Sequence, residues 1–142
     1  MAILKIAKLG NPILRRRADP IGPRQIKSVD IQRLIDDMLE TMYDAPGVGL
    51  AAIQVGVPLR LVVIDVADEE DQPKPFVLFN PEIVALGPET RLHEEGCLSI
   101  PDFRIEIERP STLTLRYLDQ QGKQREIDAD GLLATAIQHE VN

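Results

Sequence analysis

A histidine and a glutamate stand side by side near the end of the chain, in the sequence QHE at residues 138–140. On a helix, the imidazole of His139 would lie at the end of an apolar stripe made by residues three, four and seven positions earlier. Glu140 is rotated by about 100° from it and could reach over the same site without ligating a metal. Alone the pair is weak evidence, because a histidine at a helix end is commonly a partly exposed polar residue. The stripe consists of Leu132, Thr135 and Ala136.

The single cysteine, Cys97, lies in EEGCLSIP at residues 94–101. With one thiol an intrachain disulfide is excluded, and a reducing cytoplasm fits this cysteine usage. The carboxylates of Glu94 and Glu95 would raise the pKa of the thiol, so an unassisted nucleophile is disfavoured. A metal ion would reverse that effect, because it binds the thiolate directly. A buried small hydrophobe remains the alternative interpretation.

The stretch GVGLAAIQVG at residues 47–56 holds two glycines before a glutamine. Gly47 and Gly49 permit close approach of another backbone, so an extended peptide could lie against them. Gln54 would then be a neutral donor to a carbonyl oxygen. From this stretch alone, a tightly packed turn between a helix and a strand is the favoured explanation of the glycines.

A thiolate, an imidazole and a glutamate that does not ligate are together the parts of a catalytic zinc or ferrous site. Such a site normally has three protein ligands and one open position for water, whose pKa the metal lowers. Glu140 would move protons, and Gln54 would donate where negative charge develops on the substrate oxygen. The competing class is a cysteine hydrolase with Cys97 as nucleophile and His139 as base, against which the acidic neighbours of the thiol argue.

The 142 residues, 44% of them hydrophobic, suit one domain spanning residues 1–142. A net charge of −7 without a basic block argues against nucleic acid or an anionic membrane as partner. The apolar runs are too short to span a bilayer, and the N-terminal residues lack the long apolar region and small-residue cleavage site of a signal peptide. A cytoplasmic protein is expected.

Local patterns predict the elements that must position these groups. Capped by Ser28 or Asp30, a helix with one apolar face should run to Pro46 and Gly47. The preceding segment 14–23 is turn-rich and expected on the surface. The apolar face of the helix consists of Ile31, Leu34, Ile35, Met38, Leu39 and Met42.

Residues 61–66 and 76–80 are apolar, β-branched or aromatic runs that predict buried strands. Alternating patterns at 103–107 and 113–117, followed by the turn DQQG and the segment KQREIDA, predict a half-buried antiparallel hairpin. The last segment should be helical from about Gly131. Two helices with strands grouped between them predict an α+β fold with mainly antiparallel sheets and a long helix in the N-terminal half.

The three chemical segments resemble motifs of the peptide deformylase family, which removes the N-formyl group from new bacterial polypeptides. The family motifs are G-x-G-L-A-A-x-Q, E-G-C-L-S and Q-H-E-x-D-H. This chain has GVGLAAIQ at 47–54, EGCLS at 95–99 and QHEVN at 138–142. The surrounding chain is similar throughout, from LGNPILR near the start to DADGLL before the last helix. The resemblance implies that the sheets pack around the helix bearing the HExxH motif.

Position by position, the resemblance implies that Cys97 and His139 are metal ligands and that Glu140 is the catalytic acid and base. Gln54 and the backbone N–H of Leu98 match the groups that hold the formyl oxygen. The remaining matches concern the substrate. Gly49, Glu95 and Gly96 match the edges that pair with its backbone, and Arg104 matches a position at the mouth of the site. The methionine pocket is matched by Val48, by His93, where the family commonly has an apolar residue, and by Leu132, Thr135 and Ala136.

The resemblance also implies the cofactor and the partners. The cofactor would be one divalent transition metal, in first place Fe2+, with zinc, nickel or cobalt able to replace it; a thiolate ligand favours such softer ions. The partners would be N-formyl-Met peptides and nascent chains, including those at the ribosome, and the protein would be a monomer. Neither nucleic acid nor membrane is expected to bind directly.

The third motif breaks off at Asn142, where aspartate is more usual, and the second histidine would be residue 143. The chain as given therefore supplies two of the three ligands and lacks the family's C-terminal helix. Three interpretations follow: a fragment of an active deformylase, an inactive or weakly active relative that binds peptides in the same groove, or a site completed by an external ligand.

Overall fold

The computed structural model describes residues 3–8, 12–15, 17–45, 47–67, 73–97 and 100–141, and the side chains at 15 and 93–106 lie outside that description. Along the chain, the helices and short 3-10 helices (η) are η1 (Pro12–Arg15), α1 (Pro23–Ile26), α2 (Val29–Asp44), η2 (Ala52–Val55) and α3 (Gly131–Val141). The strands are β1 (Gly49–Ala51), β2 (Leu61–Ile64), β3 (Phe76–Leu86), β4 (Thr90–Cys97), β5 (Ile100–Pro110), β6 (Thr112–Leu118) and β7 (Gln124–Asp130).

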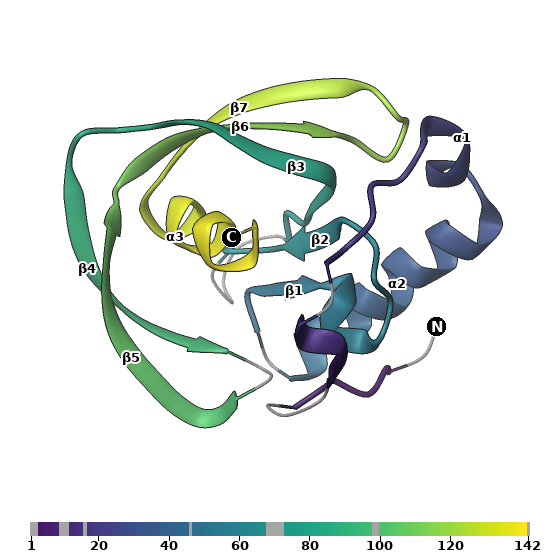
Figure 1. Cartoon of the computed structure of the whole chain (residues 1–142), viewed down its shortest axis with the longest axis horizontal. Coiled ribbons are helices and arrows are strands. Elements are labelled where there is room, and N and C mark those ends of the chain that lie inside the picture. The colour runs from purple at the N-terminus through teal and green to yellow at the C-terminus, as the bar shows by residue number, and fades with distance from the viewer. Residues whose placement is uncertain are drawn as a thin grey trace.

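Two antiparallel sheets surround the last helix. Among the described residues, β1, β2, β3, β6 and β7 form one sheet in that order, and β4 pairs with β5 in a separate hairpin. Figure 1 shows α3 in the space between the curved β4–β5 hairpin and the larger sheet. The helix contacts strands of both, including β1, β2 and β5. The predicted α+β fold with mainly antiparallel sheets around a C-terminal helix is confirmed.

Helix α2 forms where the sequence predicts it. The Ser28 hydroxyl accepts a hydrogen bond from the Ile31 N–H at 3.3 Å and so caps the first turn. Beyond the last turn, the Gly47 N–H donates to the carbonyl oxygen of Met42 at 2.7 Å. The apolar face packs into a core cluster with residues of β1, β2 and β3, and its buried members are Ile35, Met38 and Met42.

Strand β2 is buried on both faces, which explains why its sequence is a continuous apolar run rather than an alternating one. Leu61 and Val63 belong to the core cluster around α2. Val62 and Ile64 belong to the second cluster, which contains Ile137 of α3. Strand β2 therefore connects the core cluster around α2 with the cluster around α3. Fully burying each side chain of this size contributes roughly 1.5–3 kcal/mol to stability.

The segment 14–23 only partly follows its expected surface course. Arg17 and Pro20 are exposed, but Ile21 is buried in the core around α2. The Asn80 side chain holds the Ile21 backbone as a strand partner would: Oδ1 accepts from the Ile21 N–H at 2.7 Å, and Nδ2 donates to the Ile21 carbonyl at 2.8 Å. Asn80 itself has a φ of 51°, a left-handed conformation that asparagine tolerates, within the first irregularity of the β3–β6 register.

No helix in the described ranges is long and apolar enough to cross a membrane.

Candidate active site

The carboxyl group of Glu140 lies against the backbone of Gly49. Glu140 is in the last turn of α3, and only 10% of its side chain is exposed. A Cβ added to Gly49 would lie 3.0 Å from Cγ and 3.2 Å from Oε1 of Glu140. Such contacts are tighter than most side chains make, so glycine allows this approach of β1 to α3 without displacing the carboxyl.

Burial governs the protonation of this carboxyl. Loss of solvent raises the pKa of Glu140 from 4.5 to about 7, and the charge of the neighbouring His139 opposes the shift. Nε2 of His139 lies 3.9 Å from Oε1 of Glu140, and 26% of the His139 side chain is exposed. An imidazole and a desolvated carboxyl therefore stand together at the end of α3.

Gln54 is the predicted donor from the glycine-containing segment, and it is buried in η2. Its Oε1 accepts a hydrogen bond from the Ala51 N–H at 2.9 Å. With the carbonyl end engaged in this way, the other end of the amide is a hydrogen-bond donor. The segment contains a short extended strand, β1, followed by the turn η2 that ends at Gly56, whose φ is 85°; the pairing of a peptide with its glycines stays a prediction.

Strand β1 is at the edge of the five-stranded sheet. On one side it pairs with β2, where Gly49 is opposite Ile64. One residue earlier, the Val48 carbonyl accepts from the Asp65 N–H at 2.8 Å. An edge strand presents backbone groups that an extended peptide can use, and the Val48 side chain beside it is exposed.

The three residues predicted to share a helix face with His139 differ in how much of each is exposed to solvent. Thr135 and Ala136 are buried, and Ala136 belongs to the core cluster shared with β2. The Thr135 hydroxyl bonds to the carbonyl oxygen of Gly131 at 3.3 Å. Leu132, one turn earlier, is 49% exposed, so it alone of the three presents a large apolar surface to solvent.

The β4–β5 hairpin carries the remaining predicted residues. Leu98 and the side chains of His93, Glu95, Cys97 and Arg104 lie outside the described residues. The backbone register is described: Gly96 is opposite Arg104, and Cys97 ends β4. Strand β5 contacts α3, so the hairpin that contains the thiol packs on the helix that contains the imidazole.

A residue that sequence reasoning missed fixes this packing. Gln138 is buried, and its Nε2 donates to the carbonyl oxygens of Pro110 at 2.8 Å and Ala134 at 3.2 Å. The bond to Pro110 ties the last turn of α3 to the end of β5. The available signal was a glutamine between apolar helix positions, since a buried amide must find hydrogen-bond partners.

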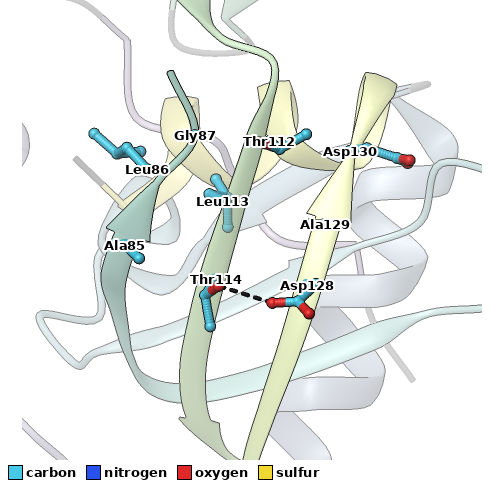
Figure 2. A pocket seen from close by; sticks show the side chains of 9 residues that line it. All are labelled: Ala85, Leu86, Gly87, Thr112, Leu113, Thr114, Asp128, Ala129 and Asp130. Atoms are coloured by element: carbon cyan, nitrogen blue, oxygen red, sulfur yellow. Dashed lines mark hydrogen bonds between the residues drawn. The ribbon is translucent and has the colours of Figure 1, made fainter. Parts of the chain in front are cut away.

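A shallow hollow of about 360 Å3 lies elsewhere, over the ends of β3, β6 and β7 (Figure 2). Leu113 and Ala129 face the core with α3, so their neighbours in the strands face the opposite way. One such neighbour, Thr114, donates to Oδ1 of Asp128 at 2.7 Å. The hollow is therefore on the face of the sheet turned away from α3, and it is separate from the site around Glu140.

Known proteins resemble this chain in both sequence and fold. The family model described as polypeptide deformylase matches residues 3–142. The chain is 50% identical over its whole length to the peptide deformylase of Rhizobium meliloti, and 55% identical to that of Bartonella quintana, covering 80% and 79% of those proteins. A crystal structure of the Acinetobacter baumannii peptide deformylase with Met-Ala-Ser bound has a TM-score of 0.93 and 35% identity, covering 99% of this chain and 91% of that one. Because the similarity runs through both sequence and fold, the protein belongs to the peptide deformylase family.

Proposed function

We propose that this protein hydrolyses the N-formyl amide of peptides that begin with formyl-methionine and releases formate. One observation carries the proposal: the buried carboxyl of Glu140 lies beside His139 and against Gly49, at an edge strand where a peptide can pair. As a peptide deformylase the protein is a hydrolase of bacterial type. We assign the catalytic domain to residues 1–142.

The family is a metalloenzyme family that uses a divalent ion. The described residues contain no group of three or more His, Cys, Asp or Glu side chains that could hold an ion. His139 is the one predicted ligand side chain among them, and a cation beside it would favour the charged form of the desolvated Glu140 carboxyl. His139 and Cys97 would hold it, and nitrogen and sulfur donors favour Fe2+, Zn2+, Ni2+ or Co2+ over Mg2+. We propose Fe2+ in first place. When bound, the ion polarises the formyl carbonyl and lowers the pKa of water.

The protein's own groups move the proton and bind the developing charge. Glu140 takes a proton from the attacking water while the oxygen of that water bonds to the formyl carbon. The amide of Gln54 donates to the carbonyl oxygen as it becomes an oxyanion, together with the Leu98 N–H that the resemblance supplies. The carbon–nitrogen bond then breaks, and Glu140 returns the proton to the leaving amine, giving formate and a free amino terminus.

The substrate would extend the larger sheet. Its backbone would pair with β1 at Gly49 on one side and with the segment at Glu95 and Gly96 on the other. The Acinetobacter relative, which binds Met-Ala-Ser, supports a peptide in this family's site. The exposed side chains of Val48 and Leu132 would be covered by the methionine. Its pocket would be completed by His93, Thr135 and Ala136, with Arg104 at the mouth.

Formate release from formyl-Met-Ala-Ser tests the proposal directly. We expect activity that a chelator abolishes and that Fe2+ or Co2+ restores. Glu140→Gln should retain the metal and lose turnover. Peptide binding without hydrolysis in the metal-loaded protein would establish a binding module instead. Activity that ignores the chelator but is destroyed by iodoacetamide would establish a cysteine hydrolase. We further propose a monomer that acts in the bacterial cytoplasm on nascent chains at the ribosome.

A further inference from the structure

Asp65 is a buried carboxylate at the junction of several chain segments. It directly follows β2, and 6% of the residue is exposed. Its Oδ2 accepts from the Tyr43 hydroxyl at 2.6 Å and from the Lys74 N–H at 3.0 Å, and its Oδ1 accepts from the Ala67 N–H at 2.9 Å. Its own backbone N–H donates to the Val48 carbonyl at 2.8 Å. One residue thus binds the end of α2, the entry to β1 and the connection from β2 to β3.

Tyr43 supplies the bond from the helix. It lies in the last turn of α2, two residues before that helix gives way to the loop that leads to β1. Tyr43 is 44% exposed, but partial loss of solvent and the hydrogen bond to Asp65 raise the pKa of its phenol to about 12. The phenol therefore keeps its proton and remains the donor at all pH values where an enzyme is ordinarily assayed.

The position of Asp65 connects this cluster to the active site. The Val48 carbonyl, which Asp65 holds through its backbone, directly precedes Gly49. Gly49 pairs with Ile64, the residue before Asp65, and lies against the carboxyl of Glu140. A shift of the Asp65 backbone would move the substrate-binding edge, whereas α3 is held separately by Gln138.

We propose that Tyr43 and Asp65 are a positioning pair that holds the β1 edge in register for the substrate backbone and thereby sets affinity for the peptide beyond its methionine. The pair acts through the backbone: the side chains of Tyr43 and Asp65 bond to each other, and the Asp65 N–H binds the Val48 carbonyl. The inference rests on the proposed function, because it takes β1 as the strand with which the peptide pairs.

Steady-state kinetics on two substrates test the pair. Tyr43→Phe removes the donor without changing the ring. For formyl-Met-Ala-Ser, KM should rise about fivefold while kcat stays within about twofold, since a hydrogen bond used equally in the ground and transition states affects binding alone. For N-formyl-methionine, which lacks the downstream backbone, both constants should stay within about twofold.

Asp65→Asn provides the second variant. In the wild type two donors converge on Oδ2 and one on Oδ1. Asparagine has only one oxygen, so in either orientation its NH2 group faces at least one of these donors and that hydrogen bond is lost. The rise in KM for the tripeptide should therefore exceed that of Tyr43→Phe. Asp128→Asn is the matched control, since it alters a 2.7 Å bond from Thr114 on the sheet face away from α3. Its KM should not change.

The inference would be overturned if the variants changed KM equally for the tripeptide and for N-formyl-methionine, if they lowered only kcat, or if KM for the tripeptide stayed unchanged. Amide hydrogen exchange separates it from the proposed function. If the wild type releases no formate, the proposed function fails, and the pair is then judged by exchange at the Asp65 N–H that binds Val48. Tyr43→Phe should speed that exchange relative to Leu115 in the core; unchanged protection would show that the pair does not hold β1.

Discussion

Glu140 of α3 and Gly49 of β1 are in contact, so close that a Cβ on residue 49 would stand 3.0 Å from Cγ of the glutamate. The contact joins the last helix to an edge strand from the first half of the chain (Figure 1). The second glycine of GVG, Gly49, is thus explained by the limited space beside the Glu140 side chain rather than by a turn. It also sets how far the carboxyl stands from a peptide paired with β1.

Gly49→Ala should therefore displace the Glu140 carboxyl. A Cβ at this distance forces its neighbour to move by a few tenths of an ångström. Since a misplacement of about 1 Å near the reacting atoms can cost about a hundredfold in rate, we expect kcat for a formyl-Met peptide to fall by up to about tenfold. Gly22→Ala is the matched control, since a Cβ there meets only Oε1 of Gln25 at 3.7 Å. Normal turnover in Gly49→Ala would mean that the carboxyl can move aside without loss.

The stability of Glu140→Gln, compared with that of the wild type when both are free of metal, measures how much the buried carboxyl destabilises the folded state. The folded pKa of about 7 lies above the ordinary 4.5, so the folded state binds the proton more tightly and stability falls as pH rises through that interval. The difference corresponds to at most about 3 kcal/mol at higher pH. In urea unfolding, the variant should exceed the metal-free wild type in stability near about pH 8 and match it below pH 4.5. A constant difference across pH would contradict this origin.

Most of the fold follows from local patterns. Helix α2 has a capping serine and apolar residues at three- and four-residue spacing, and α3 begins at Gly131 as predicted. The two early strands were also predictable, although β2 ends at Ile64 and β3 continues to Leu86. The extension was not predictable because β3 passes through Pro81 and the left-handed Asn80, features that normally end a strand. Only tertiary pairing with β6 explains it.

The site was less predictable than the fold. Helical spacing is enough to group His139 with Thr135 and Ala136, because all three depend on one element. The contact of Glu140 with Gly49 depends on how α3 packs on β1, which no local pattern encodes. Asp65 falls within the run 61–66 that the sequence predicts as a strand, although β2 ends at Ile64. The hydrogen bonds that hold its carboxylate form only where α2, β1 and the β2–β3 connection meet around it.

Gln138→Met should loosen the attachment of α3 to β5. The change keeps the length of the side chain but leaves the Pro110 carbonyl without the amide that binds it at 2.8 Å. An acceptor that loses its donor when fully buried costs roughly 1–3 kcal/mol; because Pro110 is only partly buried, urea unfolding should show a loss of about 1 kcal/mol. Gln120→Met is the control, because the Gln120 amide makes an exposed contact with Gln32. If the free energy of unfolding falls equally little in both variants, Gln138 does not hold the helix.

Gln54→Ala tests the oxyanion donor. Loss of one such donor costs about 2.7–4 kcal/mol of transition-state stabilisation, so kcat should fall by two to three orders of magnitude with KM little changed. The substitution also removes the acceptor that holds the Ala51 N–H at 2.9 Å. A rise in KM of the kind expected for Tyr43→Phe would mean that β1 has moved, whereas a fall in kcat with KM unchanged isolates the lost donor. An unchanged kcat would remove Gln54 from the mechanism, whatever happens to KM.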